Sequence, residues 1–346
     1  MCTQPNTNDL LLPLKGRKFK LGSHEYKLCD AIATGPFSSV FLVEENGVAY
    51  AMKVESQDGC LRPVLKLDHA VLSKLGGQRG FPALWDSGRT STFKYVIMQL
   101  VGPDLSMLLE FMPNNRFTLS TIYKIAIQTL ERLQTLHNSG WLNRDVKAQN
   151  FAVGLGQDSS TVYMLDFGLT RRFQETDGRP HLLRSWGPSV GTFPYAPLSS
   201  LAFSDQTPAD DVEGWLYMVI HLLKGLPWHN SKVQLNLAKT REWKMYCRKE
   251  GGKQKLFDGL PDGWADIYEL ILKTPCFELP AYAKISNMII NIAKQESIDL
   301  SIPFDWQTNA VLRSLVRLGP LSCEELSIVR TPVMMNRSNR ILLSPM

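Results

Sequence analysis

The sequence predicts an α+β chain of two lobes, a small β-rich part followed by a larger helical part. Over residues 24–100 the apolar residues alternate in short runs bounded by turn residues, which is typical of strands. After Gly102-Pro103 they recur at helical spacing instead. The chain has 346 residues, which is too long for one small core and suits one two-lobed domain or two domains. We therefore expect an arm at 1–23, lobes at 24–100 and 101–320, and a poorly ordered tail at 321–346.

Strand-like runs occupy the beginning of the first lobe, at 26–33, 37–44 and 48–55. The dipeptide Asn46-Gly47 lies between the second and third runs and predicts a tight hairpin turn. In the third run, alternation places Ala51 and Lys53 on one face of the strand and Met52 on the other. This part of the chain therefore predicts a small antiparallel sheet.

The remaining elements follow in order along the chain. A helix is predicted over 61–75, where Gly76-Gly77 ends it, and further strands are predicted at 81–85 and 94–100. The second lobe is predicted to contain a helix over 118–138 that stops at Gly140, a helix from 210 to about 223, and two more within 264–296.

Composition and charge restrict the class of protein. The chain is 44% hydrophobic and 21% charged, as expected for a globular protein. Its net charge of +5 is too small to predict nucleic-acid binding. Six scattered cysteines without a Cys-x-x-Cys pair predict reduced thiols and a cytoplasmic or nuclear protein. The longest apolar run, Trp215–Leu223, is too short to span a bilayer, so we expect no membrane segment.

The most specific feature is Asn143-Arg144-Asp145-Val146-Lys147-Ala148-Gln149-Asn150, followed sixteen residues later by Asp166-Phe167-Gly168. The first motif contains an Asp, a Lys two residues later and an Asn five residues later. The second motif supplies another Asp in an Asp-Phe-Gly turn. Such a set holds ATP with magnesium and directs a hydroxyl at the γ-phosphate. The motif pair therefore predicts phosphoryl transfer.

Further motifs carry a resemblance to a known family over residues 24–320. They are Val64-Leu65-Lys66-Leu67-Asp68, Leu100-Val101-Gly102-Pro103-Asp104-Leu105, Asn150-Phe151-Ala152-Val153-Gly154, Asp166-Phe167-Gly168-Leu169-Thr170-Arg171, Gly191-Thr192 with Tyr195-Ala196, and Leu226-Pro227-Trp228. With these motifs the chain resembles a eukaryotic protein kinase of the casein kinase I group, nearest the tau-tubulin kinase branch. It is similar to the divergent members found in nematodes.

The resemblance implies roles for the catalytic residues. Asp145 would accept or orient the proton of the substrate hydroxyl. Lys147 would stabilise charge on the transferred group, and its place in the motif points to serine and threonine substrates. Asn150 and Asp166 would ligate Mg²⁺ through oxygen atoms. Lys53 would hold the α- and β-phosphates of ATP, which would bind between the two lobes.

The resemblance also implies the residues that surround the nucleotide and the substrate. Ala51 would leave room for adenine, and Met98 stands where the family has its gatekeeper. The other implied ATP-binding residues are Ile32, Gly35, Val40, Asp68, Val101 and Ala152. Thr192 would face the substrate, and Asp211 would brace the catalytic loop, an interpretation that is compatible with a plain N-cap role for Asp211.

Four departures from the family pattern affect these expectations. The Gly-rich loop keeps only Gly35 of three glycines, which predicts weaker ATP binding. Asp68 replaces Glu as the partner of Lys53, and Asn143 replaces a scaffold His. Two arginines of the family's anion site are absent, with Pro194 and Pro208-Ala209 in their places, so a preference for phosphorylated substrates is not expected.

Two sets of basic residues have alternative interpretations. Arg171, Arg172, Arg179 and Arg184 follow the Asp-Phe-Gly motif and could meet acidic or phosphorylated substrate, or form a solvated loop. The run 241–255, which includes Lys244 and Arg248, is predicted to be a solvated helix face and loop.

The sequence thus predicts a serine/threonine protein kinase that uses ATP and Mg²⁺. We expect a cytoplasmic monomer, with a nuclear location left open, that acts on protein substrates, acidic ones among them. The alternative is a pseudokinase that serves as a nucleotide-binding or protein-interaction scaffold. Family members tend to be active without phosphorylation of the activation segment, and we expect the same here.

Overall fold

The computed structural model describes residues 11, 14–35, 37–57, 63–175, 177–229 and 236–317. The described chain divides into two compact units, and the main boundary lies between Gly102 and Pro103. Leu155–Gln157 and Arg317 belong with the first unit, and the rest of the chain from Pro103 to Val316 forms the second. The predicted tail at 321–346 lies outside the described residues.

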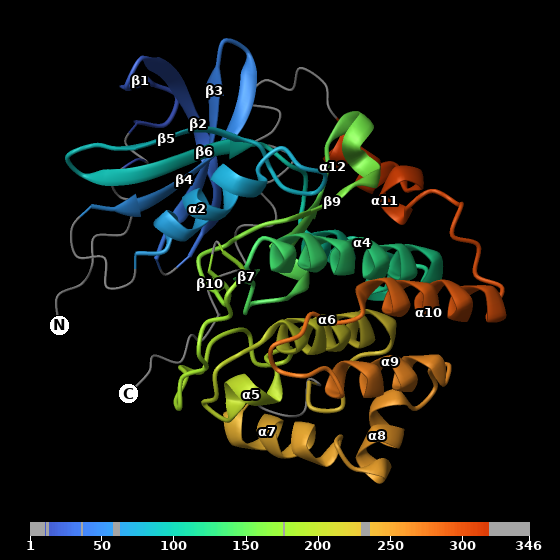
Figure 1. Cartoon of the computed structure of the whole chain (residues 1–346). Helices are drawn as coiled ribbons and strands as arrows, with labels where there is room; N and C mark the ends of the chain where they lie inside the picture. The colour runs from blue at the N-terminus through green and yellow to red at the C-terminus, as the bar shows by residue number, and fades with distance from the viewer. Residues whose placement is uncertain are drawn as a thin grey trace. The chain divides into compact units, whose positions relative to one another are not determined.

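The first unit is a six-stranded antiparallel sheet with one helix, as the alternating pattern predicts. The strands are β1 (Lys18–Leu21), β2 (His24–Thr34), β3 (Ser39–Glu45), β4 (Val48–Ser56), β5 (Leu84–Arg89) and β6 (Phe93–Gln99), in the order β1-β2-β3-β4-β6-β5. Figure 1 shows this sheet in blue and teal beside helix α2 (Leu65–Leu75). Asn46 and Gly47 both have positive φ, 51° and 79°, which confirms the predicted hairpin turn.

Strand register explains which side chains share a face. Met52 pairs with Phe41 and Ile97, and these three are fully buried in the core of this unit. The neighbouring rungs of the ladder point to the opposite face. There Lys53 pairs with Val40, and Ala51 pairs with Met98. The register therefore brings four of the sequence-predicted ATP-binding residues to one face of the sheet.

One expectation for this unit is wrong. Residues 18–21 belong to the predicted N-terminal arm, yet they form the edge strand β1 and pair with β2 through Leu21 and His24. Leu21 is buried against the core, and Gly22 makes the turn with φ of 58°. The strand is short and rich in lysine, so its sequence pattern resembles a solvated arm.

The second unit is mainly helical. Its helices are α3 (Leu105–Glu110), α4 (Leu119–Asn138), α5 (Leu198–Leu201), α6 (Pro208–Leu223), α7 (Leu237–Tyr246), α8 (Glu250–Phe257), α9 (Gly263–Leu272), α10 (Tyr282–Gln295), α11 (Asp305–Thr308) and α12 (Ala310–Val316). Short turns of 3-10 helix are η2 (Pro113–Asn115), η3 (Ala148–Asn150) and η4 (Gly156–Ser160). Figure 1 shows α4 lying beside α6 and α10, and α9 beside α6. The periodicity of 118–138 thus predicted the central helix of this unit.

Two short strand pairs carry the catalytic loop within the second unit. β7 (Trp141–Leu142) pairs with β10 (Arg171–Arg172), and β8 (Phe151–Val153) pairs with β9 (Val162–Met164). These strands join the loop between β7 and β8 to the segment that follows Asp166.

Two other expectations need correction. Within the basic run 241–255, Lys244 is fully buried and not part of a solvated face. Cys29 is disulfide-bonded, against the expectation of reduced thiols, whereas Cys247 and Cys276 are free. Among the described residues, every helix is too short or too polar to cross a bilayer.

Candidate active site

Asp145 lies at the centre of a cluster of polar side chains in the second unit. Its carboxylate accepts hydrogen bonds from the Lys147 ammonium and, at 3.2 Å, from the Asn150 amide. Its other oxygen accepts the Thr192 hydroxyl at 2.8 Å, and Lys147 Nζ lies 3.2 Å from the same hydroxyl. Three other sequence-predicted residues thus surround the carboxylate of Asp145, a residue that is 7% exposed.

The pair β8–β9 brings Asn150 and Asp166 to the same end of two adjacent strands. Asn150 immediately precedes β8, and its carbonyl accepts the Leu165 amide at 2.8 Å. Asp166 follows β9 with a positive φ of 58° and accepts the Gly168 amide at 3.2 Å. A positive φ is strained for a residue other than glycine, and such residues are found preferentially at functional sites.

Both residues suit magnesium by their donor atoms. The nitrogen of the Asn150 amide donates to the Asp145 carbonyl at 2.8 Å, so the amide oxygen is the atom left for a cation. Asp166 supplies a carboxylate, and Mg²⁺ is commonly held by one or two such protein oxygens together with waters and substrate phosphates. The donor set therefore fits Mg²⁺.

Asp211, near the beginning of α6, is tied to the backbone of the catalytic loop. Its carboxylate accepts the amide of Asn143 at 2.6 Å and the amide of Arg144 at 2.7 Å. It also lies 2.8 Å from Nε2 of His137, whose other ring nitrogen contacts the Tyr282 hydroxyl. Sequence reasoning missed His137, because a lone histidine at the end of a helix gives no signal of its partner.

Asn143 replaces the scaffold histidine of the family and forms contacts of its own. It is 2% exposed, and its side-chain oxygen accepts the Asp145 amide at 3.0 Å. The next residue, Arg144, has a positive φ of 66°, and its Nε donates to the Leu169 carbonyl at 2.8 Å. The loop thus keeps a bracing side chain at this position despite the substitution.

In the first unit, Lys53 and Asp68 form a buried ion pair. Lys53 Nζ lies 2.8 Å from Asp68 Oδ2, and the two residues are 6% and 1% exposed. The shorter aspartate therefore reaches the lysine from α2 without the methylene of a glutamate. Burial strengthens such a pair and makes the loss of one partner costly.

The other predicted ATP-binding residues fall into two groups. Ile32 packs beside Cys29 and Leu42 on the sheet of the first unit, and Val101 is buried near the end of that unit. Gly35 lies in an exposed turn where its amide donates to the Ser38 carbonyl at 2.9 Å, and Pro36 is outside the described residues. Ala152 belongs to the second unit, where it is fully buried in β8.

The arginines after the Asp-Phe-Gly motif all have internal partners. Arg171 and Arg184 both pair with Asp205, Arg179 pairs with Asp177, and Arg172 lies over the Trp141 ring at 5.1 Å. Burial alone would raise the pKa of Asp205, but hydrogen bonds from Arg184 and the charges of both arginines lower it. Arg171 and Arg184 therefore share one buried carboxylate, whereas the Arg179 side chain is 81% exposed and stays accessible to a partner.

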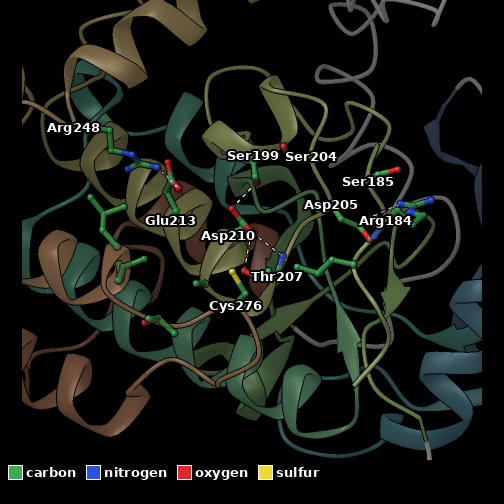
Figure 2. A pocket seen from close by; sticks show the side chains of 15 residues that line it. Arg184, Ser185, Ser199, Ser204, Asp205, Thr207, Asp210, Glu213, Arg248 and Cys276 are labelled. Carbon is green, nitrogen blue, oxygen red and sulfur yellow. Dashed lines mark hydrogen bonds and ion pairs between the residues drawn. The ribbon is translucent and has the colours of Figure 1, made fainter. Parts of the chain in front are cut away.

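A cavity of about 400 Å³ lies elsewhere in the second unit. Figure 2 shows Asp210 inside it, hydrogen-bonded to Ser199 at 2.5 Å and to Thr207 at 2.8 Å. Burial, together with the Glu213 carboxylate, raises the pKa of Asp210 to about 6. The residues that line the cavity include none of the sequence-predicted site residues, so it is separate from the cluster around Asp145.

Comparisons with known proteins agree with this arrangement. The family model described as protein kinase domain matches residues 26–274. The chain is 43% identical over 289 residues to the serine/threonine-protein kinase spe-6 of Caenorhabditis elegans. This match covers 83% of this chain and 76% of that protein. It is 29% identical over 285 residues to a probable serine/threonine-protein kinase of Dictyostelium discoideum, covering 81% of this chain and 56% of that protein.

These matches favour catalysis over the scaffold alternative. Both relatives are named as kinases. The match to the family model covers most of the chain and includes Lys53, Asp145 and Asp166. The chain belongs to the protein kinase family, and it is a serine/threonine protein kinase.

Proposed function

We propose that the chain transfers the γ-phosphate of ATP to serine and threonine hydroxyls of proteins through the cluster around Asp145. Membership of the kinase family implies ATP as the phosphate donor and protein as the acceptor. The observation that carries the proposal is the Asp145 carboxylate, which contacts Lys147, Asn150 and Thr192. Each of these contacts has a use in phosphoryl transfer.

Asp145 orients the substrate hydroxyl and accepts its proton. Its position is fixed by the Thr192 hydroxyl and by the Asn143 side chain, which holds its backbone amide. Lys147 neutralises charge that develops on the transferred phosphoryl group, because its ammonium lies beside Asp145 and Thr192. Asp145 therefore orients the substrate hydroxyl, and Lys147 stabilises the charge on the phosphoryl group.

Asn150 and Asp166 would hold Mg²⁺, which when bound would shield the charge of the phosphates. In the first unit, Lys53 binds the α- and β-phosphates, and Asp68 keeps its ammonium in place. Adenine binds against Ala51 and Met98, with Ile32, Val40, Val101 and Ala152 as further apolar contacts. The shared face of Val40, Ala51, Lys53 and Met98 supports this assignment.

We also propose the finer classification as a member of the casein kinase I group near the tau-tubulin kinase branch. The motifs at 64–68, 150–154 and 226–228 support it. The proposed state is a cytoplasmic monomer. Acidic protein segments are the first substrate class to test, because several arginines follow the Asp-Phe-Gly motif and one of them, Arg179, has a side chain that is 81% exposed.

The decisive test is transfer of labelled phosphate from ATP to casein, with Asp145→Asn and Asp166→Asn beside the wild type. Incorporation by the wild type that both variants abolish would establish the two roles. A thermal-shift measurement gives a second readout, since ATP with magnesium should stabilise the protein more than ATP with a chelator. Undiminished transfer by either variant would reject the assigned role of that residue.

A further inference from the structure

The segment Thr192–Ala196 is held in the second unit by hydrogen bonds to three different places. Lys244 Nζ donates to the carbonyl of Phe193 at 3.3 Å and to the carbonyl of Ala196. The indole of Trp228 donates to the carbonyl of Pro194 at 2.9 Å. The Tyr195 hydroxyl contacts Nδ1 of His221 at 2.6 Å. Nearly every residue of the segment thus has its own anchor.

The same segment reaches the catalytic cluster at its beginning. Thr192 donates its hydroxyl to Asp145 and lies within 3.2 Å of Lys147 Nζ. A short stretch of backbone therefore connects the catalytic carboxylate at one end with Lys244 at the other. Weaker hydrogen bonds from Lys244 to Phe193 and Ala196 would therefore change the backbone next to Thr192.

Lys244 is an unusual anchor because its ammonium is fully buried and has no carboxylate partner among the described residues. It lies 4.5 Å from the ring centre of Tyr217 and 5.2 Å from that of Trp228, so two aromatic faces stabilise its charge. The nearby Glu213 carboxylate accepts hydrogen bonds from Arg248 at 2.8 Å and from the Tyr217 hydroxyl at 2.6 Å. The two backbone carbonyls are thus the hydrogen-bond acceptors of Lys244.

The surroundings make this ammonium easy to deprotonate. Burial lowers the pKa of Lys244 to about 7, with Glu213 of α6 opposing the shift, Arg248 adding to it and Cys247 opposing it. The phenol of Tyr268 on α9 faces the same cluster, and burial, with the charge of Glu213, raises its pKa to about 12. Three other titratable groups lie beside the segment or the ammonium. Burial, with the charge of His229, lowers the pKa of His221 to about 4, and burial also lowers the pKa of His229. Burial raises the pKa of the Tyr217 phenol. Among the described residues of this cluster, Lys244 therefore has the pKa nearest to neutral pH.

We propose that Lys244 is a positioning residue for the protein substrate, because its ammonium holds the carbonyl groups of Phe193 and Ala196 in the shape that a substrate segment binds. The proposal rests on the proposed function, in which Thr192 faces the substrate. A charged donor forms hydrogen bonds about twice as strong as a neutral one, and the attraction to the two rings also depends on the charge. Loss of the proton therefore loosens the segment and weakens binding of the protein substrate as the pH rises.

Hydrogen exchange of the wild-type protein tests the proposal without any assumption about activity. The amides of Tyr195 and Ala196 both donate to the Thr192 carbonyl, whereas Pro194 has no amide hydrogen. Exchange of these two amides, corrected for the intrinsic rate at each pH, should show protection that falls between about pH 6 and 8. The variant Lys244→Met should have low protection at every pH in that range. Lys239→Met is the matched control, because Lys239 lies exposed on the same helix, and it should match the wild type.

Kinetics with dephosphorylated casein gives the functional readout. Lys244→Met should raise the KM for casein about tenfold, the factor expected for the loss of one charge-assisted hydrogen bond, and leave the KM for ATP unchanged. Trp228→Phe should also raise the KM for casein, because it removes the bond to Pro194. Lys244→Arg keeps its charge, so its KM for casein should not rise with pH.

Two results would overturn the proposal. One is wild-type protection of the Tyr195 and Ala196 amides that stays constant over this pH range, which is measurable even if no Lys244 variant folds. The other is a KM for casein that has the same pH dependence in the wild type and in Lys244→Met. Absence of phosphate transfer by the wild type, with a pH-dependent exchange profile intact, would instead count against the proposed function alone.

Discussion

Replacement of Asp211 by asparagine should show how much of the catalytic loop depends on one carboxylate. Asp211 is 2% exposed and accepts hydrogen bonds from the amides of Asn143 and Arg144, and it also lies within hydrogen-bond distance of His137. Asparagine has nearly the same shape but keeps only one acceptor oxygen. The amino group of the asparagine would face a backbone N–H group at a place where the wild type has a carboxylate oxygen.

The size of the effect follows from the number of bonds lost. Oδ2 of Asp211 meets the Asn143 amide and His137, and Oδ1 meets the Arg144 amide. An asparagine whose oxygen takes the place of Oδ2 loses the acceptor of one contact, and a hydrogen bond to a charged group contributes about 1.5–3 kcal/mol. The variant Asp211→Asn should therefore lower the free energy of unfolding by roughly 1.5–3 kcal/mol, out of a total of about 5–15 kcal/mol for a typical protein. Turnover should fall as well, because Asn143 positions the Asp145 amide.

Urea denaturation of the wild type and the variant measures the change in unfolding free energy. Asp266→Asn is the matched control, because Asp266 lies exposed on α9 and should change stability by less than about 0.5 kcal/mol. A loss of less than about 1 kcal/mol in Asp211→Asn would refute the reasoning, since it would mean that the three contacts add little to the folded state.

Three further predictions follow from single contacts. Asp68→Asn should lower the unfolding free energy by about 3–5 kcal/mol in urea denaturation, because it removes the negative charge that lies 2.8 Å from the buried Lys53 ammonium. The double variant Lys53→Met with Asp68→Leu should recover most of the loss, and a double variant no better than the single one would contradict this. Gly191→Ala should lower both Tm and turnover, because its φ is 104° and the new Cβ would lie 2.7 Å from the Arg144 carbonyl. Gly225→Ala shares a positive φ but meets nothing within 4 Å, so an equal fall in Tm for both would exclude the contact as the cause. Burial raises the pKa of Asp210 from its ordinary value to about 6. The stability that Asp210 contributes is therefore present below its ordinary pKa and is lost as the pH rises through about 6. Asp210→Asn should remove this pH dependence from the Tm, and an unchanged dependence of Tm on pH would assign it to another group.

The parts of the fold that the sequence predicted depend on local signals. Asn46-Gly47 fixes a hairpin by itself, because both residues accept a positive φ. The catalytic motif was visible because Asp145, Lys147 and Asn150 are close in sequence. β1 was missed because a strand at the edge of a sheet, with alternate residues facing solvent, can consist largely of lysine.

The remaining features depend on partners that are distant in the chain. Lys244 was expected in solvent because lysines almost always are. The rings of Tyr217 and Trp228, together with two backbone carbonyls, make its burial tolerable. The interpretation of Arg171 and Arg184 was open for the same reason. Their common partner, Asp205, is 34 and 21 residues away, and sequence alone does not indicate such a pairing.

The pairing of two arginines with Asp205 has a consequence for how the enzyme is controlled. In many kinases an activation segment is ordered by a phosphate that binds arginine and that a phosphatase can remove. Here an encoded carboxylate, 4% exposed on its side chain, meets both guanidinium groups. A genetically fixed charge is neither added by a kinase nor removed by a phosphatase, so the contacts of Arg171 and Arg184 with Asp205 form without phosphorylation.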